Sequence, residues 1–180
     1  MRVITGRARG RRLAAPTGLD VRPTSAKVKE SIFSIIQFEV EGARVLDLFA
    51  GTGQMGIEAL SRGARACVFI EKARESLQVL RKNLDATGPW PGAKVSATDA
   101  LSFLRGSGEA PFDIAFLDPP YAAGLLEACM GLLAGKMHPG GAILCETDGK
   151  TELPEAFSPF FLKKRYQYGK TCLLLYRTQP

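Results

Sequence analysis

The tetrapeptide Asp118-Pro119-Pro120-Tyr121 combines residue types that suit chemistry on a flat amine. It follows an apolar run, residues 112–117, that has the composition of a buried strand. Two successive prolines donate no hydrogen bonds to a sheet ladder, so the strand must end there. A carboxylate and a carbonyl can each accept from an amino group, and an aromatic ring can stack on a heterocycle. The tetrapeptide therefore predicts a site for chemistry on the exocyclic amine of a nucleobase.

A glycine-rich loop lies earlier in the chain, after a predicted strand at residues 44–49 and before a predicted helix. Gly51, Gly53 and Gly56 have the spacing of a dinucleotide-binding turn, in which glycine lets the backbone approach a ligand closely. Glu71 follows Gly51 by 20 residues, the position expected for an acid that binds a ribose. The loop alone is compatible with NAD and with S-adenosylmethionine.

Two further acids favour S-adenosylmethionine. Asp47 lies inside the strand ahead of the loop, where a carboxylate repels a pyrophosphate but attracts ammonium and sulfonium groups. Asp99 follows the third predicted strand and can accept from the adenine amino group while the Ala100 N–H donates to a ring nitrogen. Glu71 would accept both ribose hydroxyls, although both Glu71 and Asp99 are also candidates for capping a helix. These acids at one sheet edge therefore predict a methyl-donor site.

The net charge of +6 is concentrated near the N-terminus. Residues 1–29 hold eight basic residues and one acid, giving +7, and the remaining residues hold 16 basic and 17 acidic groups, giving −1. Such asymmetry favours a polyanionic partner, either nucleic acid or an anionic membrane surface, over a merely solvated basic tail. Val3-Ile4 and Leu13–Ala15 predict a short hairpin around Gly6–Gly10, which would present arginines to phosphates.

The composition, with 46% hydrophobic and 23% charged residues over 180 positions, is that of an ordinary globular domain. No apolar run approaches the roughly 18 residues that span a bilayer, and no apolar segment follows the arginines to form a secretory signal. We therefore expect a monomeric, cytoplasmic protein without membrane association or a metal site. His138 falls in a predicted turn and is not a predicted catalytic residue. The scattered cysteines are predicted to be buried free thiols: Cys67, Cys129, Cys145 and Cys172.

Strands alternate with helices along most of the chain, which predicts an α/β fold with a doubly wound, Rossmann-like sheet. The sheet is expected to be mostly parallel and to close with an antiparallel hairpin formed by residues 160–166 and 171–177. We expect a basic N-terminal arm at residues 1–23, ending in a linker at Pro16–Pro23, and one domain at residues 24–180. The other predicted strands are residues 44–49, 66–70, 94–97, 112–117 and 142–146, and the predicted helices are residues 24–37, 55–62, 74–86, 100–104 and 125–133.

Nearly the whole chain resembles a bacterial family, the 16S ribosomal RNA guanine-N2 methyltransferases of the RsmD type. The glycine loop, the acids at the strand ends and the Asp118 tetrapeptide resemble class I S-adenosylmethionine-dependent amino-methyltransferases in general. The narrower resemblance rests on residues 2–13, 22–33, 49–64 and 168–176. Lys29 stands where the family more commonly has arginine, a departure that keeps the charge.

The resemblance implies a class I methyltransferase sheet, S-adenosylmethionine as cofactor and methyl transfer to a guanine N2 amine in 16S ribosomal RNA. The RNA is expected free or within a small-subunit assembly particle, held by the arm. The predicted catalytic residues are Asp118, Pro119, Pro120 and Tyr121. The predicted cofactor residues are Thr24, Asp47, Phe49, Ala50, Gly51, Thr52, Gly53, Glu71, Lys72, Asp99 and Ala100. The predicted RNA-binding residues are Arg2, Arg7, Arg9, Arg11, Arg12, Arg22 and Lys27.

The expected mechanism uses two hydrogen-bond acceptors. Asp118 and the Pro119 carbonyl would each accept one amine N–H, drawing the nitrogen toward tetrahedral geometry and aiming its lone pair at the methyl carbon. Tyr121 would stack on a base taken out of its helix, and Pro120 would rigidify the loop. Alternatives are amino methylation of adenine, cytosine or a protein glutamine, an NAD-dependent oxidoreductase, and a non-catalytic RNA-binding module.

Overall fold

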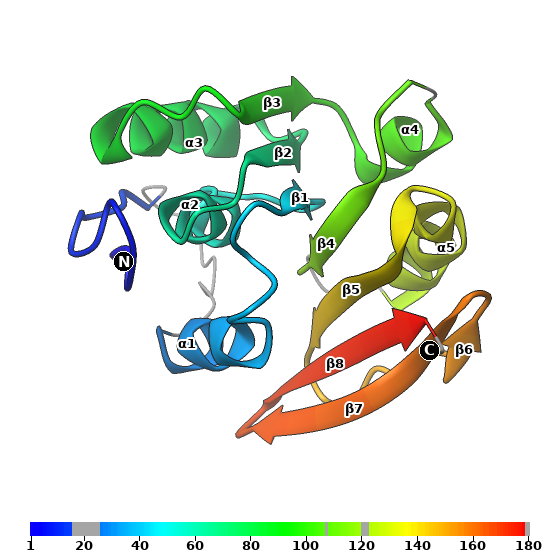
Figure 1. Cartoon of the computed structure of the whole chain (residues 1–180). Coiled ribbons are helices and arrows are strands. Elements are labelled where there is room, and N and C mark those ends of the chain that lie inside the picture. The colour runs from blue at the N-terminus through cyan, green and yellow to red at the C-terminus, as the bar shows by residue number, and fades with distance from the viewer. Residues whose placement is uncertain (16–25, 107, 120–122, 179–180) are drawn as a thin grey trace.

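The computed structural model describes residues 1–15, 26–106, 108–119 and 123–178 (Figure 1). Helices and strands alternate until a C-terminal run of strands begins. In chain order the elements are α1 (Ala26–Ile35), β1 (Arg44–Asp47), α2 (Gln54–Ser61), β2 (Ala66–Glu71), α3 (Arg74–Thr87), β3 (Ala93–Ala97), α4 (Ala100–Arg105), β4 (Phe112–Leu117), α5 (Ala123–Ala134), β5 (Met137–Thr147), β6 (Ala156–Phe157), β7 (Phe160–Tyr168) and β8 (Thr171–Thr178).

Within the described ranges the strands form a single sheet in the order β3-β2-β1-β4-β5-β8-β7-β6. The pairs from β3 to β5 are parallel, and the pairs β5–β8, β8–β7 and β7–β6 are antiparallel. The predicted Rossmann-like sheet with an antiparallel C-terminal hairpin is therefore confirmed. The chain reverses its direction of winding between β1 and β4, so their carboxyl ends border the crevice where open α/β sheets bind ligands.

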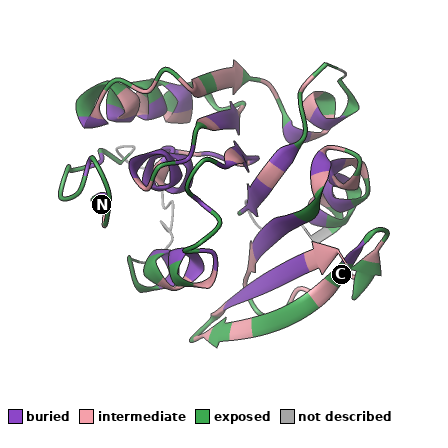
Figure 2. Ribbon diagram, in the orientation of Figure 1, coloured by how far each residue is buried: buried purple, intermediate pink, exposed green. Residues whose placement is uncertain are grey.

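Apolar strand residues fill two cores, one on each face of the sheet. Val45 of β1 packs under α1, α2 and α3, whereas its neighbour Leu46 packs under α4 and α5. The same alternation separates Phe69 from Val68 in β2. The central strands are buried, whereas β7 near the sheet edge is largely exposed (Figure 2). Continuous apolar strands follow from covering both faces with helices.

Cysteines, helix lengths and the limits of the described residues decide several predictions made outside the site. The four cysteines are buried and free, as predicted. Among the described residues, none of the helices has the length and apolar character required to cross a membrane. Several predictions fall outside the described residues: the linker Pro16–Pro23, the helix cap at Thr24 or Ser25, and the residues Arg22, Pro120 and Tyr121.

The turn predicted at His138 is wrong, because this residue lies inside β5. Gly140 has a φ of 82°, which usually marks a turn. Here the register between β4 and β5 shifts between Phe112 and Ile114, so the irregularity is absorbed as a bulge and the strand continues. The short strand β6 was also not predicted, since two residues carry too little pattern to be recognised.

The N-terminal hairpin is shorter than its predicted ladder between Val3-Ile4 and Leu13–Ala15. Residues 1–15, called the arm below, form a single antiparallel bridge between Arg2 and Arg12. The Val3 N–H donates to the Arg11 carbonyl at 2.9 Å. The buried apolar residues of the arm join the core beneath α1 and α2: Val3, Ala8 and Leu13. Docking on the domain, rather than a long strand ladder, therefore orders the arm.

Candidate active site

The loop between β1 and α2 turns sharply because glycines occupy its strained positions. Gly51 and Gly53 have φ angles of 52° and 81°, in the left-handed region that glycine adopts readily. A Cβ atom on Gly53 would clash with Leu80 of α3, and one on Gly56 would clash with Phe69 of β2. Glycine at these positions therefore lets α2 pack closely on its neighbours and holds the loop at the sheet edge.

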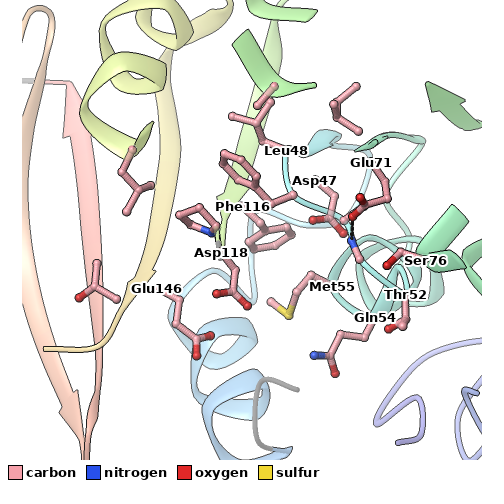
Figure 3. Close-up of a pocket in the computed structure, with 18 of the residues that line it drawn as sticks. Asp47, Leu48, Thr52, Gln54, Met55, Glu71, Ser76, Phe116, Asp118 and Glu146 are labelled. Carbon is pink, nitrogen blue, oxygen red and sulfur yellow. Dashed lines mark hydrogen bonds between the residues drawn. The ribbon is translucent and has the colours of Figure 1, made fainter. Parts of the chain in front are cut away.

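A pocket of about 1010 Å³ opens along the carboxyl ends of the parallel strands (Figure 3). Its walls come from the ends of β1, β2, β4 and β5, from the turn before α4, and from the turn between β7 and β8. The arm and α1 also border it through Met1, Ala15 and Lys27. One continuous cavity therefore joins the glycine loop, the Asp118 segment and the arm.

Asp47 ends β1 beneath the loop and is buried, with 4% of its surface exposed. Its Oδ2 accepts the Gly56 N–H at 2.9 Å, so the first turn of α2 fixes the carboxyl group. Burial raises the pKa of Asp47 to about 7 despite that hydrogen bond, and the negative charges of Asp118 and Glu71 add to the rise. A cation bound in the pocket would favour the ionised form of this group.

Glu71 and Asp99 each hold backbone groups at the edge of the pocket. Glu71 accepts the N–H groups of Gly51 at 2.9 Å and Ala73 at 2.7 Å. Asp99 caps α4 by accepting the Ser102 N–H at 2.9 Å, and hydrogen bonds from the Ser102 hydroxyl and N–H lower the pKa of Asp99. The capping alternative therefore holds for Asp99. Both acids also line the pocket, and each carboxylate oxygen has two lone pairs, so capping and ligand binding are compatible.

Most of the predicted cofactor residues line this pocket. They are Asp47, Phe49, Ala50, Gly51, Thr52, Glu71, Lys72, Asp99 and Ala100. Gly53 does not belong to the lining; it is buried against Leu80, so its place in the pattern reflects packing. Thr24 lies outside the described residues.

Several pocket residues were not predicted, because they belong to helices and turns without a motif. They include Gln54, Met55, Ser76, Phe116, Glu146, Thr147, Asp148 and residues 167–171. Glu146 carried one signal, its position at the end of a predicted strand. Asn83 was also missed: it donates to the Thr52 carbonyl at 2.9 Å and accepts the Ala14 N–H at 2.8 Å. This buried amide ties the glycine loop to the arm.

Asp118 and Pro119 follow β4 directly and line the pocket; Asp118 is exposed and Pro119 is buried. In the parallel pair of β4 and β5, Leu117 is in register with Cys145, so Asp118 and Glu146 occupy the next equivalent positions. Their carboxylates lie in the same part of the pocket, apart from the acids of β1 and β2 (Figure 3). The pocket therefore has two acidic halves, one at the glycine loop and one at the ends of β4 and β5.

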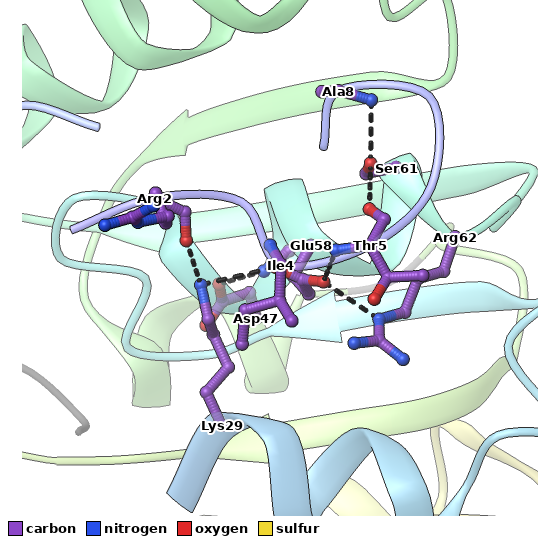
Figure 4. Close-up of polar contacts among 10 residues, drawn as sticks. Arg2, Ile4, Thr5, Ala8, Lys29, Asp47, Glu58, Ser61 and Arg62 are labelled. Atoms are coloured by element: carbon purple, nitrogen blue, oxygen red, sulfur yellow. Dashed lines mark hydrogen bonds and ion pairs between the residues drawn. The ribbon is translucent and has the colours of Figure 1, made fainter. Parts of the chain in front are cut away.

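Glu58 of α2 anchors the arm from within the core (Figure 4). Its side chain is fully buried and accepts the backbone N–H groups of Ile4 at 2.8 Å and Thr5 at 3.0 Å. The Lys29 Nζ lies 3.3 Å from one of its oxygens, and the Arg62 Nε lies 2.9 Å from the other. Because a buried carboxylate needs such partners, this cluster ties the arm to α1 and α2.

Lys29 completes this cluster from the side of α1. It is 2% exposed, and its Nζ donates to the Arg2 carbonyl at 2.8 Å. Burial lowers the pKa of Lys29, while the charge of Glu58 opposes that effect. One ammonium group therefore bridges the arm, α1 and α2, which explains why a basic residue is useful at this buried position.

The basic residues of the arm and α1 have unequal surroundings. The Arg7 guanidinium lies over Trp90, 5.0 Å from the ring centroid, and Arg11 donates to the Ala86 carbonyl at 3.2 Å. These two side chains therefore help to dock the arm. The other basic residues of the arm and the start of α1 are exposed, with no side-chain ion pair or hydrogen bond to the described residues: Arg2, Arg9, Arg12 and Lys27.

The chain matches the protein family described as Conserved hypothetical protein 95 over residues 1–177. Ribosomal RNA small subunit methyltransferase D of Escherichia coli is 36% identical over 181 residues, which cover 99% of this chain and 90% of that protein. The Bacillus subtilis protein YlbH is 39% identical over 181 residues, which cover 98% of each. The similarity therefore includes the arm as well as the sheet.

Solved structures share the whole fold. The structure of yhhF from Escherichia coli has a TM-score of 0.89 and 34% identity, covering 100% of this chain and 98% of that chain. A protein from Thermus thermophilus has a TM-score of 0.83 and 30% identity, covering 99% of each. The predicted class I methyltransferase fold is thus confirmed. The chain belongs to the family described as Conserved hypothetical protein 95, which is the RsmD family of methyltransferases.

Proposed function

We propose that this protein transfers a methyl group from S-adenosylmethionine to the N2 amine of a guanine in small-subunit ribosomal RNA. One observation carries the proposal: a single pocket contains the acids at the glycine loop and the Asp118-Pro119 segment. Methyl transfer needs donor and acceptor side by side, and a shared cavity provides this proximity. The RNA substrate is supported by relatives named ribosomal RNA small subunit methyltransferase D, from Escherichia coli and Haemophilus influenzae.

The half of the pocket at the glycine loop fits a cationic ligand. Asp47, Glu71 and Asp99 bring three carboxyl groups to its lining, which suits S-adenosylmethionine and disfavours the pyrophosphate of NAD. Asp47 would balance the positive charge, Glu71 would accept the ribose hydroxyls, and Asp99 with the Ala100 N–H would bind the adenine. When bound, the cofactor supplies a methyl group activated by its sulfonium.

The half of the pocket at the end of β4 would bind the amine of the substrate base. Asp118 and the Pro119 carbonyl would each accept one N–H of the guanine N2 amine and direct its lone pair toward the methyl carbon. As the nitrogen–carbon bond forms, positive charge grows on the nitrogen, and the Asp118 carboxylate stabilises it. The N–H proton is then lost, to Asp118 or to water. Pro120 would rigidify the loop and Tyr121 would stack on the base.

The arm would bind the RNA around the target nucleotide. Met1, Ala15 and Lys27 border the pocket, so an RNA held by the arm has its bases close to the pocket mouth. The exposed arginines carry the charge that phosphates require, and Arg22, outside the described residues, stays a predicted RNA-binding residue. The division into arm and domain, the assembly particle as substrate, the monomeric state and the cytoplasmic location remain predictions from the sequence.

Removal of the protein from cells tests the overall proposal. Ribosomal RNA from the deletion strain, digested to nucleosides and analysed by mass spectrometry, should lack one N2-methylguanosine in the small subunit. The purified protein and S-adenosylmethionine should restore that nucleoside in the RNA or in small subunits from the same strain. Unchanged modification in the deletion strain would refute the proposal.

Asp118→Ala tests the chemical step. Because the variant loses an acceptor for the amine and the charge that stabilises it, methyl transfer should fall by about a hundredfold or more. Calorimetric affinity for S-adenosylmethionine should stay within about threefold of wild type, since the cofactor contacts lie in the other half of the pocket. Asp85→Ala, an exposed acid of α3, is the matched control. Wild-type turnover in Asp118→Ala would contradict the assigned role.

A further inference from the structure

Glu146 has no part in the chemistry described so far, yet it lines the amine half of the pocket. It is half-buried near the carboxyl end of β5. Beyond the register pair of Leu117 and Cys145, it occupies the position that matches Asp118 on the neighbouring strand. Adjacent strands lie about 4.8 Å apart, and paired positions of parallel strands point to the same face. An amine held by Asp118 therefore lies beside Glu146.

The carboxylates of Glu146 and Asp118 lie near each other in the same part of the pocket (Figure 3). Glu146 has one more methylene group than Asp118, so its carboxylate can extend farther along the base. A base whose amine is held by Asp118 and the Pro119 carbonyl can turn its Watson–Crick edge to Glu146, and the ring nitrogen beside the amine on that edge is N1 in guanine and adenine and N3 in cytosine. The chemistry of this ring nitrogen therefore determines whether Glu146 binds the base or repels it.

The nucleobases that carry an exocyclic amine differ at this ring nitrogen. On the Watson–Crick edge guanine has N1–H, a donor, beside its N2 amine (N3, on the other side of the amine, is an acceptor), whereas adenine N1 and cytosine N3 are acceptors beside theirs. A carboxylate is only an acceptor when ionised. It can therefore form a charge-assisted hydrogen bond with guanine N1–H. In adenine or cytosine it would face a lone pair instead. A site that leaves such polar groups unpaired rejects the substrate strongly.

We propose that Glu146 is the residue that selects guanine, by accepting the N1–H while Asp118 and the Pro119 carbonyl hold the N2 amine. This inference rests on the proposed function and supplies what the tetrapeptide lacks, because Asp118 and Pro119 accept from any exocyclic amine. The selectivity then comes from β5, a strand separated from β4 by the whole of α5 in the sequence.

The test compares guanine with 2-aminopurine, which keeps the 2-amine but has an unprotonated N1. Both bases are placed at the mapped target position of 16S ribosomal RNA by ligation, alone or reconstituted with small-subunit proteins. We expect the wild-type protein to prefer guanine by about a hundredfold or more in kcat/KM, because 2-aminopurine leaves Glu146 facing a lone pair. Glu146→Gln should lower kcat/KM for guanine by about tenfold to a hundredfold.

Glu146→Gln should also change the selectivity itself. Its amide can donate to the N1 atom of 2-aminopurine, so the preference for guanine should fall by at least about tenfold. Comparing this ratio between proteins cancels the different intrinsic reactivity of the two amines. Glu146→Asp keeps the charge but is one methylene group shorter, so it should retain more of the preference than Glu146→Gln. Glu127→Gln, an exposed acid on α5 outside the pocket lining, is the matched control and should behave as wild type.

The outcomes separate this inference from the proposed function. If the wild-type protein forms no N2-methylguanosine at all, the proposed function fails. If it methylates guanine but Glu146→Gln keeps the wild-type preference, the role of Glu146 fails and the proposed function stands. Equal wild-type rates on guanine and 2-aminopurine would also overturn that role, and this comparison needs no variant. Cofactor affinity and thermal melting verify that each variant is folded.

Discussion

At the scale of single residues, Asp47 lies in an environment that disfavours its ionised form. The group is buried, and its neighbouring charges are the acids Asp118 and Glu71. Such an arrangement destabilises the ionised form until a cation arrives. Burying such a carboxyl group lowers the stability of the fold, and the group becomes useful when a positive ligand binds. This trade of stability for binding is typical of a functional site.

Asp47→Asn should separate these two effects. In the unfolded chain Asp47 ionises near pH 4, but in the folded protein it keeps its proton until about pH 7. The raised pKa therefore leaves the free energy of unfolding unchanged below pH 4. As the pH rises from 4 to 7, it lowers that free energy by on the order of 4 kcal/mol at most. Asparagine can still accept the Gly56 N–H and cannot ionise. Thermal melting should show a gain for Asp47→Asn that is larger at pH 8 than at pH 5.

The same substitution should weaken cofactor binding. We expect the Kd for S-adenosylmethionine at pH 7 to rise by about tenfold to a hundredfold, because an ionic hydrogen-bonding partner is lost. Calorimetry in buffers of different ionisation enthalpy should detect proton release on binding to wild type and less release in Asp47→Asn. The control is Asp85→Asn on the surface of α3. A pH dependence shared by both variants would argue against the assignment to Asp47.

At the scale of elements, the arm is held by side chains that come from three helices. Glu58 of α2 accepts two of its N–H groups, Lys29 of α1 binds its carbonyl at Arg2, and Asn83 of α3 binds Ala14. These contacts position both ends of the arm next to the pocket. The proposed role of the arm in RNA binding therefore depends on this buried cluster.

Gly6→Ala should release the arm, and Gly10→Ala is its matched control. Both glycines have φ near 80°, so alanine adds similar backbone strain at each. A Cβ atom on Gly6 would collide with the Ser61 carbonyl, whereas one on Gly10 meets open space. Gly6→Ala should also weaken the hydrogen bonds from the Arg7 and Ala8 N–H groups to Ser61.

Hydrogen exchange measures this release directly. The Ile4, Thr5 and Ala8 amides should exchange much faster in Gly6→Ala than in Gly10→Ala, and KM for the RNA should rise by about tenfold with little change in kcat. Cofactor affinity should stay near wild type in both variants. Equal exchange in the two variants would show that close packing of Gly6 on α2 does not hold the arm.

At the scale of the whole molecule, charge and cavity are arranged around one sheet edge. The acids line the pocket and exposed arginines lie on the arm that borders it, so under the proposed function the rim would attract an RNA backbone while the interior would bind a cation and an amine. Arg7 and Arg11 are engaged in docking, which leaves Arg2, Arg9 and Arg12 as the arm side chains available to phosphates, and Arg9 and Arg12 are the pair to test.

The double variant Arg9→Ala/Arg12→Ala should weaken RNA binding and flatten its salt dependence. Losing two phosphate contacts lowers the slope of log K against log salt by about 1.5. Filter binding or fluorescence anisotropy at several salt concentrations measures this slope. Arg105→Ala/Lys163→Ala removes two exposed charges outside the pocket lining and should leave the slope unchanged. An unchanged slope in the arm variant would mean that these arginines do not bind the RNA backbone.

Much of the fold was predictable because local patterns are strong where both faces of a strand are buried. The strand at residues 112–117 was predicted with the observed bounds, and the glycine loop was placed between the correct strand and helix. The turn at His138 was an error because β5 takes its register from β4, and the arm ladder was an error because docking on α2 orders the arm. The strand β6 was missed because two residues carry too little pattern. Glu146 escaped notice because a single acid after a strand carries no motif.

The sequence by itself determined the sheet, the glycine loop, the acids at its strand ends and the excess of charge at the N-terminus, because each is encoded by neighbouring residues. Only the tertiary structure decided that the pKa of Asp47 rises, that Glu58 anchors the arm, and that Glu146 joins Asp118 in one pocket. These properties depend on burial and on contacts between remote segments. Folding creates both of them, and no local pattern encodes them.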